Sequence, residues 1–405
     1  MTVDPSTLAD RVDGDEVVSL VQDLVRIESP YFEEDEIVDF VFEWFDDAGL
    51  DPERHPVVES AYTGYEGANV LAPVEGSDPD APTLLLNAHV DTVELVDEWE
   101  EDPLSGRVAD GKLYGQGACD MKAGLAAAMV ATRELAAPDV DLAGDVLFTA
   151  VVDEEGPYGL GTDQLIRDGI TDECDAAVVT EPGPVLAQSD VENPALLLGA
   201  RGRFLYDIEV RGEAAHGSQP RKGTNAVAAA GVLADALAEM ETADHPDLGS
   251  GSVCPLGIEG GGETLSVPEH CRLSVDRHVV PGETETVVRE QAEAVVADLD
   301  LDAEVSIGFR EGPEGARYGP YVTDRDHPLV GALADGARAT TGRDPEFGYF
   351  ASVGDFNYLG DRAGLPTVIV GPDGANIHGA GEYVDTDEVV EVTELLVDGL
   401  ARYLQ

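Results

Sequence analysis

The stretch TLLLNAHVD, residues 83–91, joins a short apolar run to two chemically active side chains. Residues 83–88 have the length and composition of a buried strand in a parallel sheet. His89 follows the run directly, and Asp91 follows two residues later. Functional groups of open α/β sheets gather outside the carboxyl ends of the strands. We therefore expect His89 at the functional edge of a sheet.

Three further apolar runs lead into residues that commonly bind metals. They are residues 145–152 before Glu154 and Glu155, residues 176–180 before Glu181, and residues 366–370 before a Gly-rich turn and His378. Residues 121–137 are rich in Ala, Leu and Met and predict a helix, with Asp120 at the position of an N-cap. The alternation of strands and helices predicts an α/β fold with a doubly wound sheet.

A chain of 405 residues exceeds the usual size of a single core, so two domains are expected. The predicted elements of residues 195–311 have a different order, the β-α-β-β-α-β of a ferredoxin-like fold. We interpret this block as a domain inserted into a first domain made of residues 1–194 and 312–405. One continuous sheet is the alternative, but the block is complete in itself.

The chain contains 83 Asp and Glu against 23 Lys and Arg, a formal net charge of −60. Such a surface repels nucleic acid, and it lacks the basic patch that nucleic-acid binding requires. The acidic residues lie within apolar, foldable segments, so they do not indicate disorder. Because molar salt screens their repulsion over about 3 Å, the composition predicts a halophilic protein.

The sequence favours the cytoplasm. No apolar run approaches the roughly 18 residues that span a membrane, so no membrane partner is expected. The first ten residues, MTVDPSTLAD, lack the basic and apolar regions of a signal peptide. The four cysteines have no CxxC spacing, and we expect them to be reduced and buried.

Acidic residues are too common in this chain to mark a site, whereas only eight histidines occur. A His-x-Asp pattern is present at His89 and again at His245, where a polar turn indicates a solvated loop. Capping carboxylates beside two unrelated histidines would be the purely structural interpretation. The repeated placement of ligand-type residues at strand ends instead favours a metal site.

Seven stretches follow one another along nearly the whole chain. They are LLNAHVDTV (85–93), YGQGACDMKAG (114–124), VVDEEGPYGLGT (151–162), VVTEP (178–182), AAHGSQPRKGTNAV (214–227), SVDRHVVPGET (274–284) and GPDGANIHGAGEYV (371–384). Together they resemble the M20 metallopeptidases, which include acetylornithine deacetylase, succinyl-diaminopimelate desuccinylase and aminoacylase. The resemblance implies a zinc-hydrolase domain of mixed sheet and an inserted ferredoxin-like lid domain, through which a homodimer would form.

The resemblance also implies two Zn²⁺ ions, for which Co²⁺ or Mn²⁺ could substitute. His89 and Glu181 would bind one ion, Glu155 and His378 the other, and Asp120 would bridge them. The peptide after the bridging aspartate is commonly cis in the family, which implies a cis bond between Asp120 and Met121.

Two residues would support the reaction itself. Asp91 would orient the His89 imidazole and fix its tautomer without binding metal itself, and Glu154 would be the general base. Because adjacent side chains of a strand point to opposite faces, Glu154 and Glu155 can both serve the site only if the chain bends after Val152.

On the substrate side, His216 is similar to the family's lid histidine, which donates to the oxyanion and in dimers comes from the neighbouring subunit. Arg277 is similar to the arginine that clamps a substrate carboxylate. Asn225 is a weaker candidate for substrate binding. In the purely structural alternative, His216 is a surface histidine in a loop, Arg277 forms a surface ion pair and Asn225 caps a helix. The stretches at 265–268 (LSVP) and 351–355 (ASVGD) depart from the relatives' pattern, so the substrate is less well defined than the chemistry.

These observations predict a zinc-dependent amidohydrolase that removes an N-acyl group from an amino acid, of the kind used in amino-acid biosynthesis. Metal-activated water would attack the amide, with Glu154 moving the proton. A di- or tripeptidase or carboxypeptidase acting on short peptides is the alternative within the family. A metal-free binding protein that has lost turnover is the alternative of another class.

Overall fold

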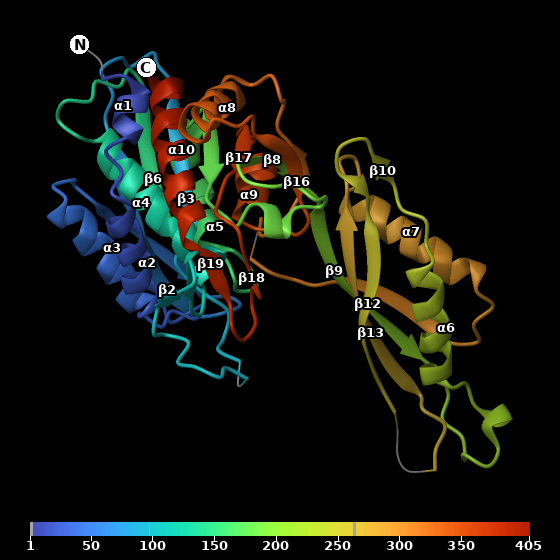
Figure 1. The fold of residues 1–405 in the computed structure, drawn as a ribbon. Coiled ribbons are helices and arrows are strands. Elements are labelled where there is room, and N and C mark those ends of the chain that lie inside the picture. The colour runs from blue at the N-terminus through green and yellow to red at the C-terminus, as the bar shows by residue number, and fades with distance from the viewer. Residues whose placement is uncertain (1–2, 97, 262–264, 314) are drawn as a thin grey trace. The chain divides into compact units, whose positions relative to one another are not determined.

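The computed structural model describes residues 3–96, 98–261, 265–313 and 315–405, and the chain divides into two compact units (Figure 1). The large unit contains residues 1–200, 313–316 and 322–405. The inserted unit contains residues 201–312 and 317–321. Each unit has its own hydrophobic core.

A nine-stranded mixed sheet forms the centre of the large unit. In spatial order its strands are β1 (Glu53–Glu59), β2 (Tyr65–Val74), β6 (Asp145–Val151), β3 (Thr83–His89), β7 (Ala176–Val179), β17 (Thr367–Ile369), β8 (Ala195–Ala200) and β15 (Tyr321–Val322), with β16 (Glu346–Phe350) also paired to β8. The four strands β6, β3, β7 and β17 are parallel neighbours, whereas β2 and β8 run antiparallel to them on either side. The four predicted strands therefore end at one edge of the sheet.

The apolar run at residues 84–86 explains why β3 is central. Leu84 pairs with Val146 of β6 on one side and with Ala176 of β7 on the other. All three leucines are completely buried. Complete burial of a leucine side chain stabilises the fold by about 1.5–3 kcal/mol.

Helices pack around this sheet, and α10 contacts both α8 and α4 (Figure 1). The helices of the large unit are α1 (Pro5–Ala9), α2 (Gly14–Val25), α3 (Asp35–Asp47), α4 (Ala123–Leu135), α5 (Leu160–Arg167), α8 (Pro328–Thr341), α9 (Asp355–Asn357) and α10 (Thr386–Leu404). A second, small sheet has the order β18 (Gly374–Ala375), β19 (Tyr383–Asp385), β5 (Lys112–Tyr114) and β4 (Arg107–Ala109).

The inserted unit is a four-stranded antiparallel sheet with two helices. Its elements in chain order are β9 (Gly202–Arg211), α6 (Ala226–Ala238), β12 (Ser252–Gly260), β13 (His270–Val279), α7 (Glu285–Asp298) and β14 (Glu304–Phe309), with the short pair β10 (Asp244–His245) and β11 (Gly249–Ser250). The spatial order β12-β13-β9-β14 gives the ferredoxin-like arrangement.

Two local expectations were wrong. Residues 195–200 form β8, which belongs to the large sheet, so the compact inserted unit begins at Arg201 instead of residue 195. Asp120 does not cap the Ala-rich helix, because α4 begins only at Ala123. Residues 118–122 instead form an irregular turn in which Asp120 has φ −114° and ψ 98°.

Candidate metal centre

His89 is the last residue of β3, and the buried strand leaves its imidazole at the carboxyl edge of the sheet. Its Nδ1 lies 3.0 Å from the backbone oxygen of Asp91 and 3.5 Å from the Asp91 carboxylate. An Nδ1–H that donates to Asp91 leaves the lone pair of Nε2 for the site. The position of Asp91 therefore agrees with the orienting role that the resemblance implies.

Glu154 and Glu155 follow β6, and the chain bends just before them. Asp153 has φ 60°, a left-handed conformation that Asp tolerates better than most residues. The Asp91 carboxylate then accepts hydrogen bonds from the backbone N–H groups of Glu154 (3.2 Å) and Glu155 (2.9 Å). The predicted bend after Val152 is confirmed, and it brings both glutamate side chains to the same site.

The Asp120 carboxylate lies between the two predicted histidines. Its Oδ1 is 3.3 Å from His89 Nε2, and its Oδ2 is 3.3 Å from His378 Nε2. The peptide bond between Asp120 and Met121 is cis, as the family resemblance implied. One carboxylate oxygen thus faces each histidine, which is the arrangement required of a bridging ligand.

Glu181 and Glu155 complete the two sides of the cluster. Glu181 Oε1 lies 3.7 Å from His89 Nε2, and Glu155 Oε1 lies 2.8 Å from His378 Nε2. Glu154 Oε2 is also close to His89, at 4.0 Å. The geometry brings together all five predicted ligands, and it places Glu154 within reach of one of the two metal positions.

Burial and mutual repulsion dominate the electrostatics of the centre. Burial, followed by the neighbouring Glu181 carboxylate, raises the pKa of Glu154 well above its ordinary value. Burial and Asp120 likewise raise the pKa of Glu155 to about 7. Hydrogen bonds to Asp120 and Glu155 raise the pKa of His378 to about 11. A positive charge placed among these buried carboxylates would therefore relieve their mutual repulsion.

These residues fit divalent cations. Histidine nitrogens and carboxylate oxygens are the ligands that zinc takes in catalytic sites. Ligand atoms of His89, Glu154 and Glu181 lie within 4.8 Å of one another, as do those of His89, Asp120 and Glu155. Among the residues that the structure describes, the ion pairs of these carboxylates are with histidines, and Lys or Arg does not neutralise them.

Sequence reasoning assigned no role to Glu382, Gly354 or Asp355, which all lie close to the centre. Glu382 accepts hydrogen bonds from the loop that carries Asp120. A Cβ on Gly354 would lie 2.7 Å from Glu154 Oε1. Asp355 is buried at the start of α9, and its charge contributes to the raised pKa of Glu154. The stretches GAGEYV and ASVGD contained these residues, but neither ends a predicted strand.

His216 lies in an exposed loop of the inserted unit. Its Nδ1 is 3.2 Å from the backbone nitrogen of Ser218, whose N–H donates to it. Since Nδ1 accepts, the imidazole proton of the neutral ring is on Nε2, which can donate to a substrate. Asn225 is the N-cap of α6, where its Oδ1 accepts from the backbone N–H of Ala228 at 3.0 Å.

Arg277 is completely buried within the inserted unit. Alternate residues of β13 face the core, and Arg277 shares that face with Leu273, Val275 and Val279. Its guanidinium is paired with the buried Glu283 carboxylate and donates to the backbone oxygen of His278. Binding a substrate carboxylate therefore requires this buried pair to open.

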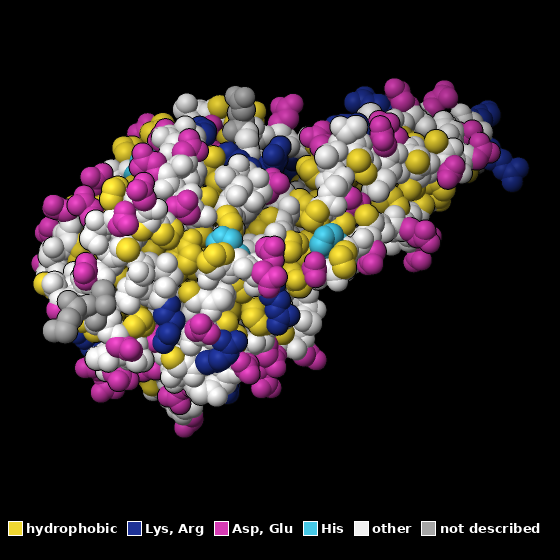
Figure 2. Space-filling model, turned by 90° about the horizontal axis from the view of Figure 1, so that it is seen from above, with side chains coloured by type: hydrophobic (Ala, Val, Ile, Leu, Met, Phe, Trp, Pro, Cys, Tyr) yellow, Lys and Arg dark blue, Asp and Glu magenta, His cyan; other side chains and the backbone are white. Residues whose placement is uncertain are grey.

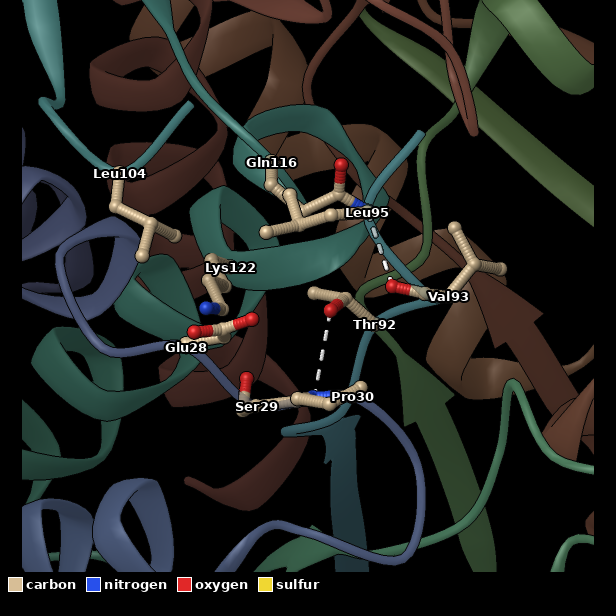
Figure 3. A pocket seen from close by; sticks show the side chains of 9 residues that line it. All are labelled: Glu28, Ser29, Pro30, Thr92, Val93, Leu95, Leu104, Gln116 and Lys122. Carbon is tan, nitrogen blue, oxygen red and sulfur yellow. Dashed lines mark hydrogen bonds between the residues drawn. The ribbon is translucent and has the colours of Figure 1, made fainter. Parts of the chain in front are cut away.

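A small cavity lies beside the loop that carries Asp120 (Figure 3). Ser29, Thr92, Gln116 and Lys122 are among the residues that line it, and its volume is about 10 Å³. The Lys122 ammonium donates to the backbone oxygen of Ile27 at 2.6 Å, and burial lowers the Lys122 pKa to about 7. A cavity of this size holds about one water molecule, so it is not a substrate site.

None of the helices in the described parts of the chain is long and apolar enough to cross a membrane. Acidic side chains are spread over the face shown in Figure 2 and far outnumber the basic ones there.

Comparisons with known proteins agree with the geometry. The chain is 30% identical over 383 residues to succinyl-diaminopimelate desuccinylase of Ralstonia pickettii, covering 91% of this chain and 93% of the relative. It is 27% identical over 354 residues to N-formyl-4-amino-5-aminomethyl-2-methylpyrimidine deformylase of Bacillus subtilis, covering 82% of each chain.

Among solved structures, an aminopeptidase of Bacillus cereus has a similar fold, with a TM-score of 0.77 and 22% identity over 97% of this chain and 100% of the other. Residues 85–402 match the model of the peptidase family M20/M25/M40. This match includes every ligand-type residue of the centre. The chain belongs to the M20/M25/M40 peptidase family, whose members are metallohydrolases that act on amide bonds.

Proposed function

We propose that the chain removes an N-acyl group from an amino acid with two zinc ions bound at the candidate centre. The Asp120 carboxylate, with one oxygen 3.3 Å from each histidine, is the observation that carries this proposal. His89 and Glu181 would hold one ion, and Glu155 and His378 the other. Co²⁺ or Mn²⁺ would be accepted as substitutes because the ligands are nitrogen and oxygen.

The ions, when bound, would polarise both the attacking water and the amide carbonyl. Glu154 would take a proton from the water and return it to the leaving nitrogen. Its raised pKa favours this role, because a base must also act as an acid near neutral pH. Asp91 would keep Glu154 and Glu155 in place through their backbone N–H groups.

Residues of the inserted unit would contact the substrate. His216 would donate from Nε2 to the oxygen that gains charge during attack. Arg277 and Asn225 are proposed for the substrate side from the family resemblance alone. Their polar groups make internal contacts in the structure, so His216 is the residue that the local geometry supports best.

The relatives support an N-acyl compound as the substrate class, and the desuccinylase among them supports an acylated amino acid. Two different deacylating enzymes, a desuccinylase and a deformylase, align with most of the chain at 27–30% identity. Peptidases share the fold, and the same chemistry would cleave a short peptide. The acyl group therefore has to be determined by experiment.

A hydrolysis panel tests the proposal. N-acetyl, N-succinyl and N-formyl amino acids and a set of dipeptides are compared in 2 M potassium chloride with added zinc. We expect the highest kcat/KM for an acylated amino acid. A preference for dipeptides would make the chain a peptidase. Fewer than one zinc ion per chain, with no activity restored by zinc or cobalt, would leave only a binding protein.

We also propose that the chain forms a homodimer through the edge of the inserted sheet. The edge strand β12 exposes Leu256 (57%) and Ile258 (49%), and α6 packs beside it with Val232 exposed. An unpaired edge with apolar side chains favours a protein partner. Leu256→Lys should convert a dimer to a monomer in light scattering, whereas Val58→Lys, at a similarly exposed site on β1, should not. A monomeric parent protein would contradict this proposal.

The charge of −60 supports a halophilic, cytoplasmic setting for the enzyme, and we include that setting in the proposal.

A further inference from the structure

Glu382 is a buried carboxylate, 1% exposed, that accepts three backbone hydrogen bonds from one loop. Its Oε1 accepts from the N–H groups of Cys119 (2.9 Å) and Asp120 (3.0 Å). Its Oε2 accepts from the N–H of Gly117 (3.0 Å). These N–H groups lie at the N-terminal end of the irregular turn at residues 118–122, where a helix provides no acceptors of its own, so Glu382 supplies them.

Glu382 also belongs to the chain segment that carries His378, four residues earlier. The backbone oxygen of Glu382 accepts from the N–H of Gly115, and the next residues pair as β19 with β5. Side chain and backbone of Glu382 thus fasten the segment of His378 to the segment of Asp120. His378 Nε2 and Asp120 Oδ2, the ligand atoms that these two segments carry, lie 3.3 Å apart.

A carboxyl group can make this contact in full. It offers acceptors on both oxygens, whereas glutamine would turn an NH₂ group toward at least one backbone N–H. A further buried carboxyl group beside the acidic centre is costly unless it is well hydrogen-bonded. If the side chain at position 382 only filled space, glutamine, which has the same shape, would serve equally well.

We propose that Glu382 is a positioning residue that fixes Asp120 relative to His378 and thereby sets the affinity of the centre for metal. The inference rests on the proposed metal site. Loss of a group that orients metal ligands typically lowers metal affinity by about 10–100-fold. Glu382 itself has no contact with the reacting atoms in this proposal.

The test compares Glu382→Gln with Glu59→Gln. Glu59 is a matched control because its buried carboxylate also accepts from three backbone N–H groups, those of Ala61, Tyr62 and Thr63, in a turn without ligands. Zinc affinity is measured by competition with a chromophoric chelator in 2 M potassium chloride. The cobalt absorption spectrum and the melting temperature of the metal-free protein are recorded beside it.

We expect Glu382→Gln to lower the affinity for at least one zinc ion by about 10–100-fold and to alter the cobalt absorption spectrum. Glu59→Gln should lower the melting temperature of the metal-free protein without changing zinc affinity. Glu382→Asp, which retains two acceptor oxygens on a shorter side chain, should bind zinc with intermediate affinity, and it serves as the test if Glu382→Gln does not fold.

Unchanged zinc affinity and cobalt spectrum in Glu382→Gln would overturn the inference. So would equal losses of zinc affinity in the Glu382 and Glu59 variants, because the effect would then be one of general stability. The result is separate from the hydrolysis panel. A parent protein that binds two zinc ions but hydrolyses nothing refutes the proposed function and leaves the role of Glu382 open to this same measurement.

Discussion

Glu154 and Glu155 are adjacent in the chain, yet the structure gives them different neighbours. Glu155 contacts His378 at 2.8 Å, whereas the shortest contact of Glu154 with a histidine is 4.0 Å, to His89. A ligand atom of Glu154 also lies within 4.8 Å of those of His89 and Glu181, so the position of Glu154 suits two roles, that of the general base and that of a metal ligand.

Glu154→Gln should separate these two roles. An amide cannot accept and return a proton, so we expect kcat to fall by about 10²–10⁴-fold. Metal content, measured by atomic emission, should remain at the parent value because the five proposed ligands are intact. Glu155→Gln is the matched comparison and should lose metal. If Glu154→Gln loses metal as well, Glu154 is a ligand.

Arg277→Ala distinguishes a substrate clamp from an internal brace. Removal of one partner of a buried ion pair typically costs about 3–5 kcal/mol, so we expect a lower melting temperature. KM should be compared for a free carboxylate substrate and for its methyl ester. Equal effects on both substrates would reject the clamp. A rise in KM confined to the free carboxylate would show that the Arg277–Glu283 pair opens during binding.

Among the secondary-structure elements, the parallel strands were the most predictable. Residues 83–88, 145–152, 176–180 and 366–370 all lie in or around observed strands, and their ends converge as expected. Their nearly continuous apolar composition, without polar alternation, is typical of strands buried on both faces of a sheet. The positions of His89, Glu181 and His378 follow from that pattern.

The connections between strands could not be predicted in the same way. The Ala-rich run extends back to residue 121, but the helix begins at Ala123 because the preceding turn is fastened to Glu382. This contact joins residues more than 260 positions apart, and no local pattern contains it. By contrast, strand alternation could have placed Arg277 on the buried face of β13, together with Leu273 and Val275.

The loop before α9 gives a prediction at this scale. A Cβ added to Gly354 would lie 2.7 Å from Glu154 Oε1 and 2.7 Å from the ring of Phe356. Gly354→Ala should therefore displace the Glu154 carboxylate, and we expect kcat to fall by about 10²-fold with metal content unchanged. Gly331→Ala in α8 is the control, because open space surrounds that position. A normal kcat in Gly354→Ala would mean that the loop before α9 shifts and the Glu154 carboxylate stays in place.

The whole molecule carries a charge of −60, which makes its stability depend on salt. The Debye length falls from about 10 Å at 0.1 M salt to about 3 Å at 1 M, so repulsion across the surface is progressively screened. We expect the melting temperature, followed by circular dichroism, to rise steadily between 0.1 and 2 M potassium chloride. A melting temperature that does not change over this range would contradict salt adaptation.

The position of β17 has a consequence for the order in which the protein is made. This strand lies between β7 and β8, although nearly 170 residues, including the whole inserted unit, separate it from β8 in the chain. A nascent chain that ends before residue 367 exposes the facing edges of β7 and β8, and it lacks His378 and Glu382. The inserted unit is nearly continuous in sequence and can fold earlier, as domains generally do during translation. Completion of the proposed two-metal centre therefore requires the chain beyond residue 367, and a chain terminated before it has an open sheet and lacks the His378 ligand.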